Sequence, residues 1–249
     1  MSGHLEISGL TKTFGGLIAI SDVTFALEPG SLSAVIGPNG AGKTTLFNMV
    51  TGHLVPTRGS IRLDREELVG LKPRAIVRRG IGRAFQVANL FGTFTVEDAM
   101  AAAVLSHRGK LFDMIGTFPS PEARDRARYV MSLVGLSGSE TRRCDTLSHG
   151  DRKLLDIALA LALEPRILLL DEPTAGMGRD ESRVMIERIH RLWESERMTL
   201  VFIEHDMDIV FGIAQRVFVL RHGALLASGT PAEIRQHPQV IEAYLGSAA

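Results

Sequence analysis

The chain has 249 residues, of which 45% are hydrophobic and 22% charged, and its 28 basic and 28 acidic side chains give no formal net charge at pH 7. This length fits one large α/β domain, or one domain with an embedded subdomain, and the apolar content is enough for a packed core. The neutral balance gives no electrostatic argument for a nucleic-acid partner, because such domains are usually basic on one face. The single cysteine, Cys144, excludes a disulfide framework and fits a reducing compartment.

No stretch of the sequence predicts a membrane span or a secretory signal. Residues 1–10 carry polar and acidic side chains and no long apolar region. The apolar run at 154–163 contains Asp156 and is shorter than the ~18 to 20 apolar residues that a spanning helix needs. If the protein acts at a membrane, we expect it to do so through a partner.

The first part of the chain predicts strands separated by turns. Apolar and polar positions alternate at 5–7 and at 23–27, which is typical of half-buried strands. Pro29 and Gly30 mark a turn before a buried strand at 31–36. The pattern then predicts a helix at 43–52, a strand at 61–63, a short helix at 73–79 and a strand at 81–85. We expect residues 1–87 to hold an N-terminal antiparallel β-subdomain and the first part of the core.

From about residue 88 to residue 163 the pattern becomes mostly helical. Thr95 and Asp98 resemble a capping box, with Asp in place of the usual Glu or Gln. Pro121 after Ser120 is typical of a first helical position. A third helix is predicted at 151–163, whereas residues 107–119 are poorly periodic. We therefore expect a helical subdomain at 88–163, inserted into an α/β core.

The core pattern resumes at residue 164 and continues to residue 249. A buried strand is predicted at 167–171, followed by a helix at 180–196 whose apolar residues are expected to face inward: Val184, Ile186, Ile189 and Leu192. Further predicted elements are a strand at 199–204, a hairpin of 216–220 with 224–228, and a final helical pair capped by Thr230 and Pro231. Strands that alternate with helices predict a mainly parallel core sheet.

A glycine-rich segment between a strand and a helix fits GxxxxGK[ST] at every fixed position. Its glycines let the backbone turn tightly and point amide hydrogens inward, and the helix that follows adds a partial positive charge. Lys43 supplies a full charge toward phosphates, and Thr44 offers its hydroxyl to Mg²⁺. The alternative is a glycine-rich turn with a chance lysine. The predicted nucleotide-binding residues are Gly37, Pro38, Asn39, Gly40, Ala41, Gly42, Lys43, Thr44 and Thr45.

Two carboxylates follow four apolar residues at the end of the strand predicted at 167–171. Ligands bind at this edge of open α/β sheets. We expect Asp171 to hold Mg²⁺ through water, and Glu172 to orient and polarise an attacking water, a general-base role worth roughly 10²–10⁴-fold. The alternative is a solvated acidic strand end before a proline turn.

These motifs, taken together, resemble the ATP-binding cassette (ABC) ATPases, and the resemblance covers nearly the whole chain. The matching features occur in the family's order: the glycine loop, Gln86, Leu147–Asp151, Asp171–Pro173, Ala175–Gly178 and His205. The resemblance implies a P-loop NTPase (RecA-like) fold that binds ATP and Mg²⁺ and dimerises head to tail. It also implies that the signature loop covers the ATP of a second subunit through Ser148, His149, Gly150 and Asp151.

The resemblance assigns further roles. Gln86 would contact Mg²⁺ and water, His205 would contact the γ-phosphate, and Phe14 would stack on adenine. Without it, Gln86 would be an ordinary surface residue, His205 a structural histidine, and Phe14 a core aromatic of the β-subdomain. The expected catalytic set is Glu172, His205, Gln86 and Lys43, and the expected metal set is Thr44, Gln86 and Asp171.

The signature departs from the more common LSGGQ at two positions. His149 replaces the first of two glycines, and Asp151 brings a negative charge in place of glutamine. We hypothesise that the composite site built with this signature is weaker or asymmetric. The segment 175–178 also lacks the usual Leu-Asp pair.

Within this family the chain is most similar to the ATPase of branched-chain amino acid importers. The similarity lies in residues 83–91, 203–207, 229–234 and 240–246. It implies a second ATPase subunit, identical or different, two membrane permeases and an extracytoplasmic binding protein, with this chain on the cytoplasmic face of the membrane. A permease helix would dock near 87–103, where Leu90, Phe91, Phe94 and Val96 are either interface or core. The solute is not encoded here, so urea, short amides and other amino acids remain open. The alternatives are an exporter or lipopolysaccharide-extraction ATPase and a soluble ABC ATPase outside transport.

Overall fold

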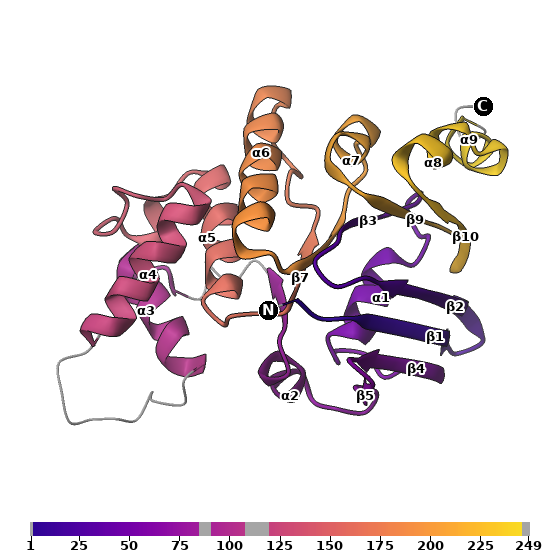
Figure 1. Ribbon diagram of the computed structural model, residues 1–249, viewed down its shortest axis with the longest axis horizontal. Coiled ribbons are helices and arrows are strands. Elements are labelled where there is room, and N and C mark those ends of the chain that lie inside the picture. Colours follow the sequence, from indigo (N-terminus) through magenta and orange to yellow (C-terminus); the bar gives the residue numbers. More distant parts are fainter. Residues whose placement is uncertain (1, 85–90, 108–119, 246–249) are drawn as a thin grey trace.

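The computed structural model describes residues 2–84, 91–107 and 120–245, and Figure 1 shows two sheets beside a lobe of helices. None of the helices in these ranges is both long enough and apolar enough to cross a bilayer. The lobe lies at the left of Figure 1, and the sheets lie at the right.

The N-terminal strands form a four-stranded antiparallel sheet, as predicted. The strands are β1 (Leu5–Phe14), β2 (Leu17–Leu27), β4 (Arg58–Leu63) and β5 (Glu66–Glu67), in the order β2-β1-β4-β5. The β1–β2 hairpin closes with Phe14 opposite Leu17, because Gly15 and Gly16 between them both adopt positive φ.

The second sheet has six strands, and all pair in parallel except the edge strand β10. They are β3 (Leu32–Ile36), β6 (Ile81–Ala84), β7 (Ile167–Asp171), β8 (Thr199–Ile203), β9 (Arg216–Arg221) and β10 (Ala224–Gly229), in the order β10-β9-β3-β8-β7-β6. The expected mainly parallel core sheet is therefore confirmed.

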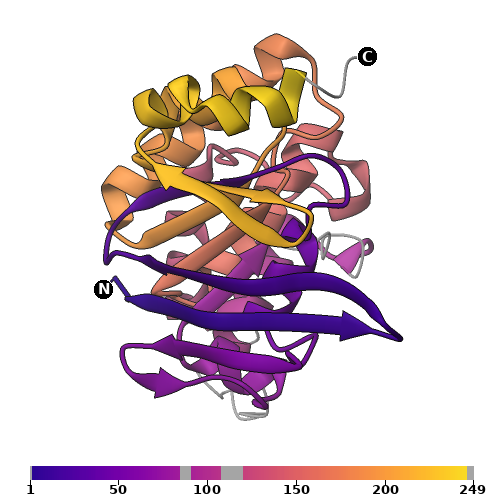
Figure 2. The ribbon, with the colours of Figure 1, turned by 90° about the vertical axis from the view of Figure 1, so that its right-hand side faces the viewer.

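Both faces of this sheet are covered, which explains why its strands are apolar at successive positions. In β7, Ile167 and Leu169 pack in one cluster with residues of the antiparallel sheet and of helix α1 (Lys43–Val50). Figure 2 shows the ribbon of the N-terminal strands, in indigo and purple, below the C-terminal strands, in yellow. Leu168 and Leu170 pack in a second cluster with the helices on the opposite face. The buried strands end together at one edge, where Asp171 and Glu172 follow.

The lobe contains α3 (Val96–His107), α4 (Pro121–Val134), the short 3₁₀ turn Cys144–Thr146 and α5 (His149–Leu161). Side-chain oxygens cap each helix start: Thr95, Ser120 and Ser148 accept from amides three residues on. Because Ser148 is the cap, α5 begins two residues before the predicted start. The predictions for 85–90 and 108–119, Gln86 included, lie outside the described residues.

The remaining helices are α2 (Pro73–Arg78), α6 (Arg179–Glu196), α7 (Met207–Ile213), α8 (Pro231–Gln236) and α9 (Pro238–Leu245). The prediction that Val184 faces the core is wrong, since it is 48% exposed. The buried stripe of α6 runs through Met185, Ile189 and Leu192, and Val184 lies to one side of it. Helix α7 was not predicted.

Candidate active site

The glycine loop connects β3 to α1 and lies tightly against neighbouring backbone. Gly37, Gly40 and Gly42 all adopt positive φ. A Cβ at Gly42 would come within 2.8 Å of the Ala19 carbonyl oxygen, and one at Gly37 would overlap the carbonyl oxygen of Leu220. These positions therefore require glycine, and the loop amides gather at the N-terminus of α1.

The Lys43 ammonium group is held inside the loop. Its Nζ donates to the carbonyl oxygens of Gly37 at 2.7 Å and Pro38 at 3.1 Å, and only 5% of the residue is exposed. Burial lowers the pKa of Lys43, while the carboxylates of Glu172 and Asp171 oppose that shift. The expected phosphate-binding cation thus lies between the glycine loop and the acidic strand end.

The loop opens onto a hollow of about 530 Å³ bounded by residues from five parts of the chain. Its lining comprises Leu17, Ile18, Ala19, Asn39, Gly40, Ala41, Gly42, Lys43, Thr44, Thr45, Glu172, His205, His222 and Gly223. Phe14 is absent from this lining and is 44% exposed, with Lys12 Nζ 5.0 Å from its ring centroid. Phe14 is therefore not a core aromatic, which corrects that alternative. Leu17 and Ile18, which sequence reasoning missed, border the hollow instead.

Glu172 and His205 meet directly at the edge of this hollow. His205 Nε2 lies 2.6 Å from Glu172 Oε1. Glu172 has a φ of +49°, and its backbone N–H donates to the carbonyl oxygen of Ile203 on β8. The adjacent Glu204 is buried and accepts from the backbone and hydroxyl of Thr174, which ties the ends of β7 and β8 together.

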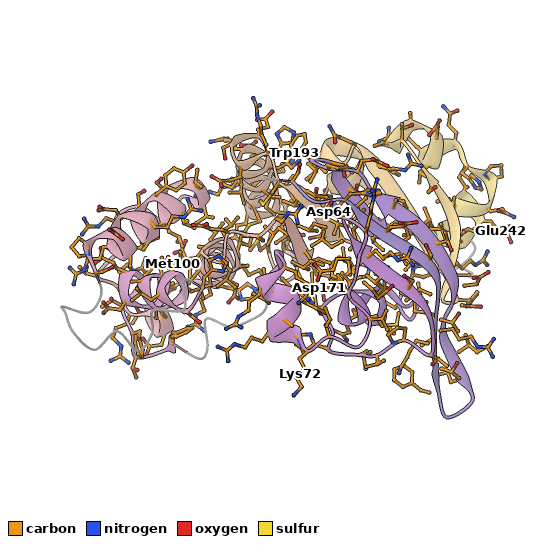
Figure 3. All side chains as sticks on the ribbon, turned by 60° about the horizontal axis from the view of Figure 1, so that its bottom comes forward. Asp64, Lys72, Met100, Asp171, Trp193 and Glu242 are labelled. Atoms are coloured by element: carbon orange, nitrogen blue, oxygen red, sulfur yellow. The ribbon has the colours of Figure 1, made fainter. Side chains whose placement is uncertain are left out.

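Asp171, labelled near the middle of the molecule in Figure 3, forms a nearly buried ion pair that was not predicted. Arg83 Nη2 lies 2.6 Å from Asp171 Oδ2, and the two side chains are 6% and 22% exposed. Arg83 also donates to Asn48 Oδ1 at 2.7 Å and lies over the ring of Phe47. The guanidinium group neutralises the carboxylate expected to act toward Mg²⁺.

A second hollow of about 460 Å³ is lined by Thr44, Arg83, Ala84, Lys153, Asp171, Glu172 and Ala175. Within the described residues, no group of three or more His, Cys, Asp or Glu is placed to hold a metal. However, Mg²⁺ beside a nucleotide needs only one or two protein oxygens, with phosphate and water supplying the rest. The hydroxyl of Thr44 and the carboxylate of Asp171 fit that requirement.

The signature residues line a different hollow from the glycine loop, together with residues of α6. Ser148 Oγ accepts from the Asp151 N–H at 3.1 Å, and Asp151 lies 3.7 Å from Arg142. The His149 ring nitrogen Nε2 lies 3.3 Å from the Ala175 carbonyl oxygen. Within one chain, Ser148, His149, Gly150 and Asp151 are therefore not brought to the P-loop.

Comparisons with known proteins place these features in a family. The model of the family described as "ABC transporter" matches residues 20–175, and that of "Branched-chain amino acid ATP-binding cassette transporter" matches residues 224–249. The branched-chain amino acid transport ATP-binding proteins BraF of Pseudomonas aeruginosa and LivG of Escherichia coli are each 41% identical, over 98% of this chain and 98% of theirs.

Solved structures agree with this result. The ADP conformation of MJ1267, an ATP-binding cassette of an ABC transporter, is 26% identical with a TM-score of 0.86, over 99% of this chain and all of that one. The dimeric cassette MJ0796 is 25% identical with a TM-score of 0.76, over 91% of this chain and 98% of that one. The chain therefore belongs to the ABC transporter family, and its fold is that of the family's ATP-binding cassette.

Proposed function

We propose that this chain is the ATP-binding and ATP-hydrolysing subunit of an importer for branched-chain amino acids or related small polar solutes. The observation that carries this proposal is the end-to-end similarity to BraF and LivG, which spans 98% of this chain. The match of residues 224–249 to the branched-chain amino acid cassette family supports it independently, because that segment lies outside the ATPase motifs.

The arrangement of side chains suits hydrolysis of ATP. The loop amides and Lys43 bind the phosphates, and Glu172 takes a proton from the attacking water. His205, at 2.6 Å, orients the Glu172 carboxylate and lines the same hollow. Thr44 and Asp171 would hold Mg²⁺, which neutralises phosphate charge when it is bound.

A second ATPase subunit completes the site in this proposal. Ser148 and the amides at the start of α5 lie in a separate hollow, so they are available to the nucleotide of a partner cassette. The MJ0796 cassette, described as dimeric, supports such an arrangement. The partner is a second copy or a different ATPase subunit.

A groove between α2 and the lobe is the proposed site for the membrane permease. It has a volume of about 420 Å³ and a mostly apolar lining that includes Ile76, Val77, Phe91, Ala103 and Leu159. Of the residues expected near it, Val96 is fully buried, Phe94 is 41% exposed, and Leu90 lies outside the described residues. Docking there places the chain on the cytoplasmic face of the membrane, with the binding protein on the other side.

The proposal is tested by reconstituting the chain with its permeases in vesicles and supplying ATP on the cassette side. We expect uptake of labelled leucine that requires the binding protein and stops with Lys43→Ala. Transport in the opposite direction would support the exporter alternative. ATP hydrolysis with no transport of leucine, other amino acids, amides or urea would contradict the proposal.

A further inference from the structure

Helix α5 carries a partly buried cation to the residue proposed as the catalytic base. Lys153 Nζ donates to the backbone carbonyl oxygen of Glu172 at 2.7 Å. Lys153 lies five residues after the N-cap Ser148, so the helix that begins with the signature residues also contacts the acidic strand end of its own chain.

The contact supports a backbone conformation that side chains rarely adopt. Glu172 has a φ of +49°, which is uncommon for a residue with a Cβ and is maintained only where the surroundings fix it. Its N–H donates to the Ile203 carbonyl oxygen at 3.0 Å, and its own carbonyl oxygen accepts from Lys153 and from the Ala175 N–H at 3.1 Å. Both ends of the Glu172 backbone are therefore held, and its carboxylate is directed to His205.

The position of Lys153 is electrostatically constrained. Burial lowers the pKa of Lys153, and four carboxylates oppose that shift: Glu204, Glu172, Asp156 and Asp171. The side chain also lines the hollow that contains Thr44, Asp171 and Glu172. A charged donor among these groups makes a stronger hydrogen bond to a carbonyl oxygen than a neutral donor would.

We propose that Lys153 is a positioning residue for catalysis, which holds Glu172 in its left-handed conformation and makes the aim of its carboxylate depend on the placement of α5. The inference rests on the proposed ATPase function. Since the start of α5 is the surface proposed to cover the partner's ATP, one helix links the partner's nucleotide to the base of its own site. A displacement of α5 would lengthen the Lys153–Glu172 bond and misplace the carboxylate.

The first experiment compares three variants of the assembled complex: Lys153→Met, Lys153→Arg and Arg152→Met. Arg152 is the matched control, because it lies on the same helix but donates within the lobe, to the Asp145 carbonyl oxygen. We expect Lys153→Met to lower kcat for ATP hydrolysis by about 10- to 100-fold, as for a misplaced catalytic group, with KM changed less than about 2-fold. Lys153→Arg keeps a charged donor and should restore most of kcat, and Arg152→Met should stay near the parental rate.

The second experiment separates positioning of Glu172 from direct contact with phosphate. If Lys153 acts only through the base, adding Lys153→Met to Glu172→Gln should cause no further loss of kcat. A raised KM for Lys153→Met, together with a kcat of the double variant that falls by the product of the two single losses, would mean that Lys153 contacts phosphate and would overturn the proposal. An unchanged kcat in Lys153→Met would overturn it as well. If Lys153→Met does not fold, Lys153→Arg is measured instead, by itself and in the Glu172→Gln background. Any fall in kcat that Lys153→Arg causes must then vanish in that background. A parental-like kcat for both Lys153→Arg and Lys153→Gln would overturn the proposal. Hydrolysis by Glu172→Gln at the parental rate would instead refute the base assignment, a distinguishable failure.

Discussion

Replacing Arg83 with methionine removes the guanidinium group that neutralises Asp171 while keeping a side chain of similar length. Both partners are largely buried, at 6% and 22% exposed, and they lie 2.6 Å apart. Removing one member of a buried ion pair costs about 3–5 kcal/mol, because the other charge is left uncompensated. Partial solvent access to Asp171 reduces this cost, so we expect about 2–4 kcal/mol. For a chain of this size, that corresponds to an apparent Tm lower by about 5–15 °C.

The assay is thermal unfolding at pH 7, with Arg62→Met as a matched control. Arg62 and Glu67 also form an ion pair, but their side chains are 51% and 44% exposed, so this control should lose less than about 1 kcal/mol. In an Asp171→Asn background, Arg83→Met should cost about 1–3 kcal/mol less than it does alone. Equal losses for Arg83→Met and Arg62→Met, or the same loss in both backgrounds, would refute the reasoning.

Three further predictions follow from buried groups. The Tyr244 hydroxyl is buried beside the backbone of Gly37, and burial raises the pKa of Tyr244 to about 12. Because this hydroxyl lies against the glycine loop, Tyr244→Phe should weaken ATP binding about 2- to 10-fold by calorimetry, and an unchanged Kd would contradict this. Burial raises the pKa of the Cys144 thiol to about 11, so native protein should resist iodoacetamide at pH 8 while unfolded protein reacts. The free energy of unfolding should also fall as the pH rises from about 9 to 11, because only the thiol of the unfolded chain ionises in that range. Lys43→Met should raise the Kd for ATP more than about 10-fold, but it should not lower Tm, because burial of the ammonium group opposes folding. A lower Tm would contradict this and would show that Lys43 stabilises the folded glycine loop.

The chemistry of the site could be predicted from the sequence where each feature is local. The loop at 37–45 needs only a strand before it, a helix after it and glycines at the tight turns. Asp171 and Glu172 needed only a run of apolar residues to place them at a strand end. The structure has these elements where the pattern predicted them, and it also brings His205 against Glu172, a contact that was not predicted.

Contacts between distant segments could not be predicted. Arg83 and Asp171 are 88 residues apart and meet only because β6 pairs with β7. Lys153 reaches Glu172 because α5 packs beside β7, and a lysine on a polar helix face gives no sign of such a contact. Tyr244 lies near the end of the chain, and the sequence does not indicate which part of the core its helix covers.

Two errors in the helices have a local cause. Ile186, Ile189 and Leu192 are buried as predicted, but Val184 was counted with them only because its side chain is apolar. Val184 lies five residues before Ile189, about 140° away around the helix, whereas Met185 lies four residues before it and shares its face. Helix α7 has only seven residues, and Gly212 weakens its helical pattern. The helix exists because Asp206 caps its first turn and Val210 packs in the core.

The most direct test of the account is single-turnover hydrolysis of ATP by the assembled complex carrying Glu172→Gln. The account predicts that ATP still binds with near-parental affinity and that the chemical step slows by about 10²–10⁴-fold, because the substituted amide cannot accept the proton of the attacking water. Hydrolysis at the parental rate with ATP bound would show that Glu172 is not the base and would contradict the proposed mechanism.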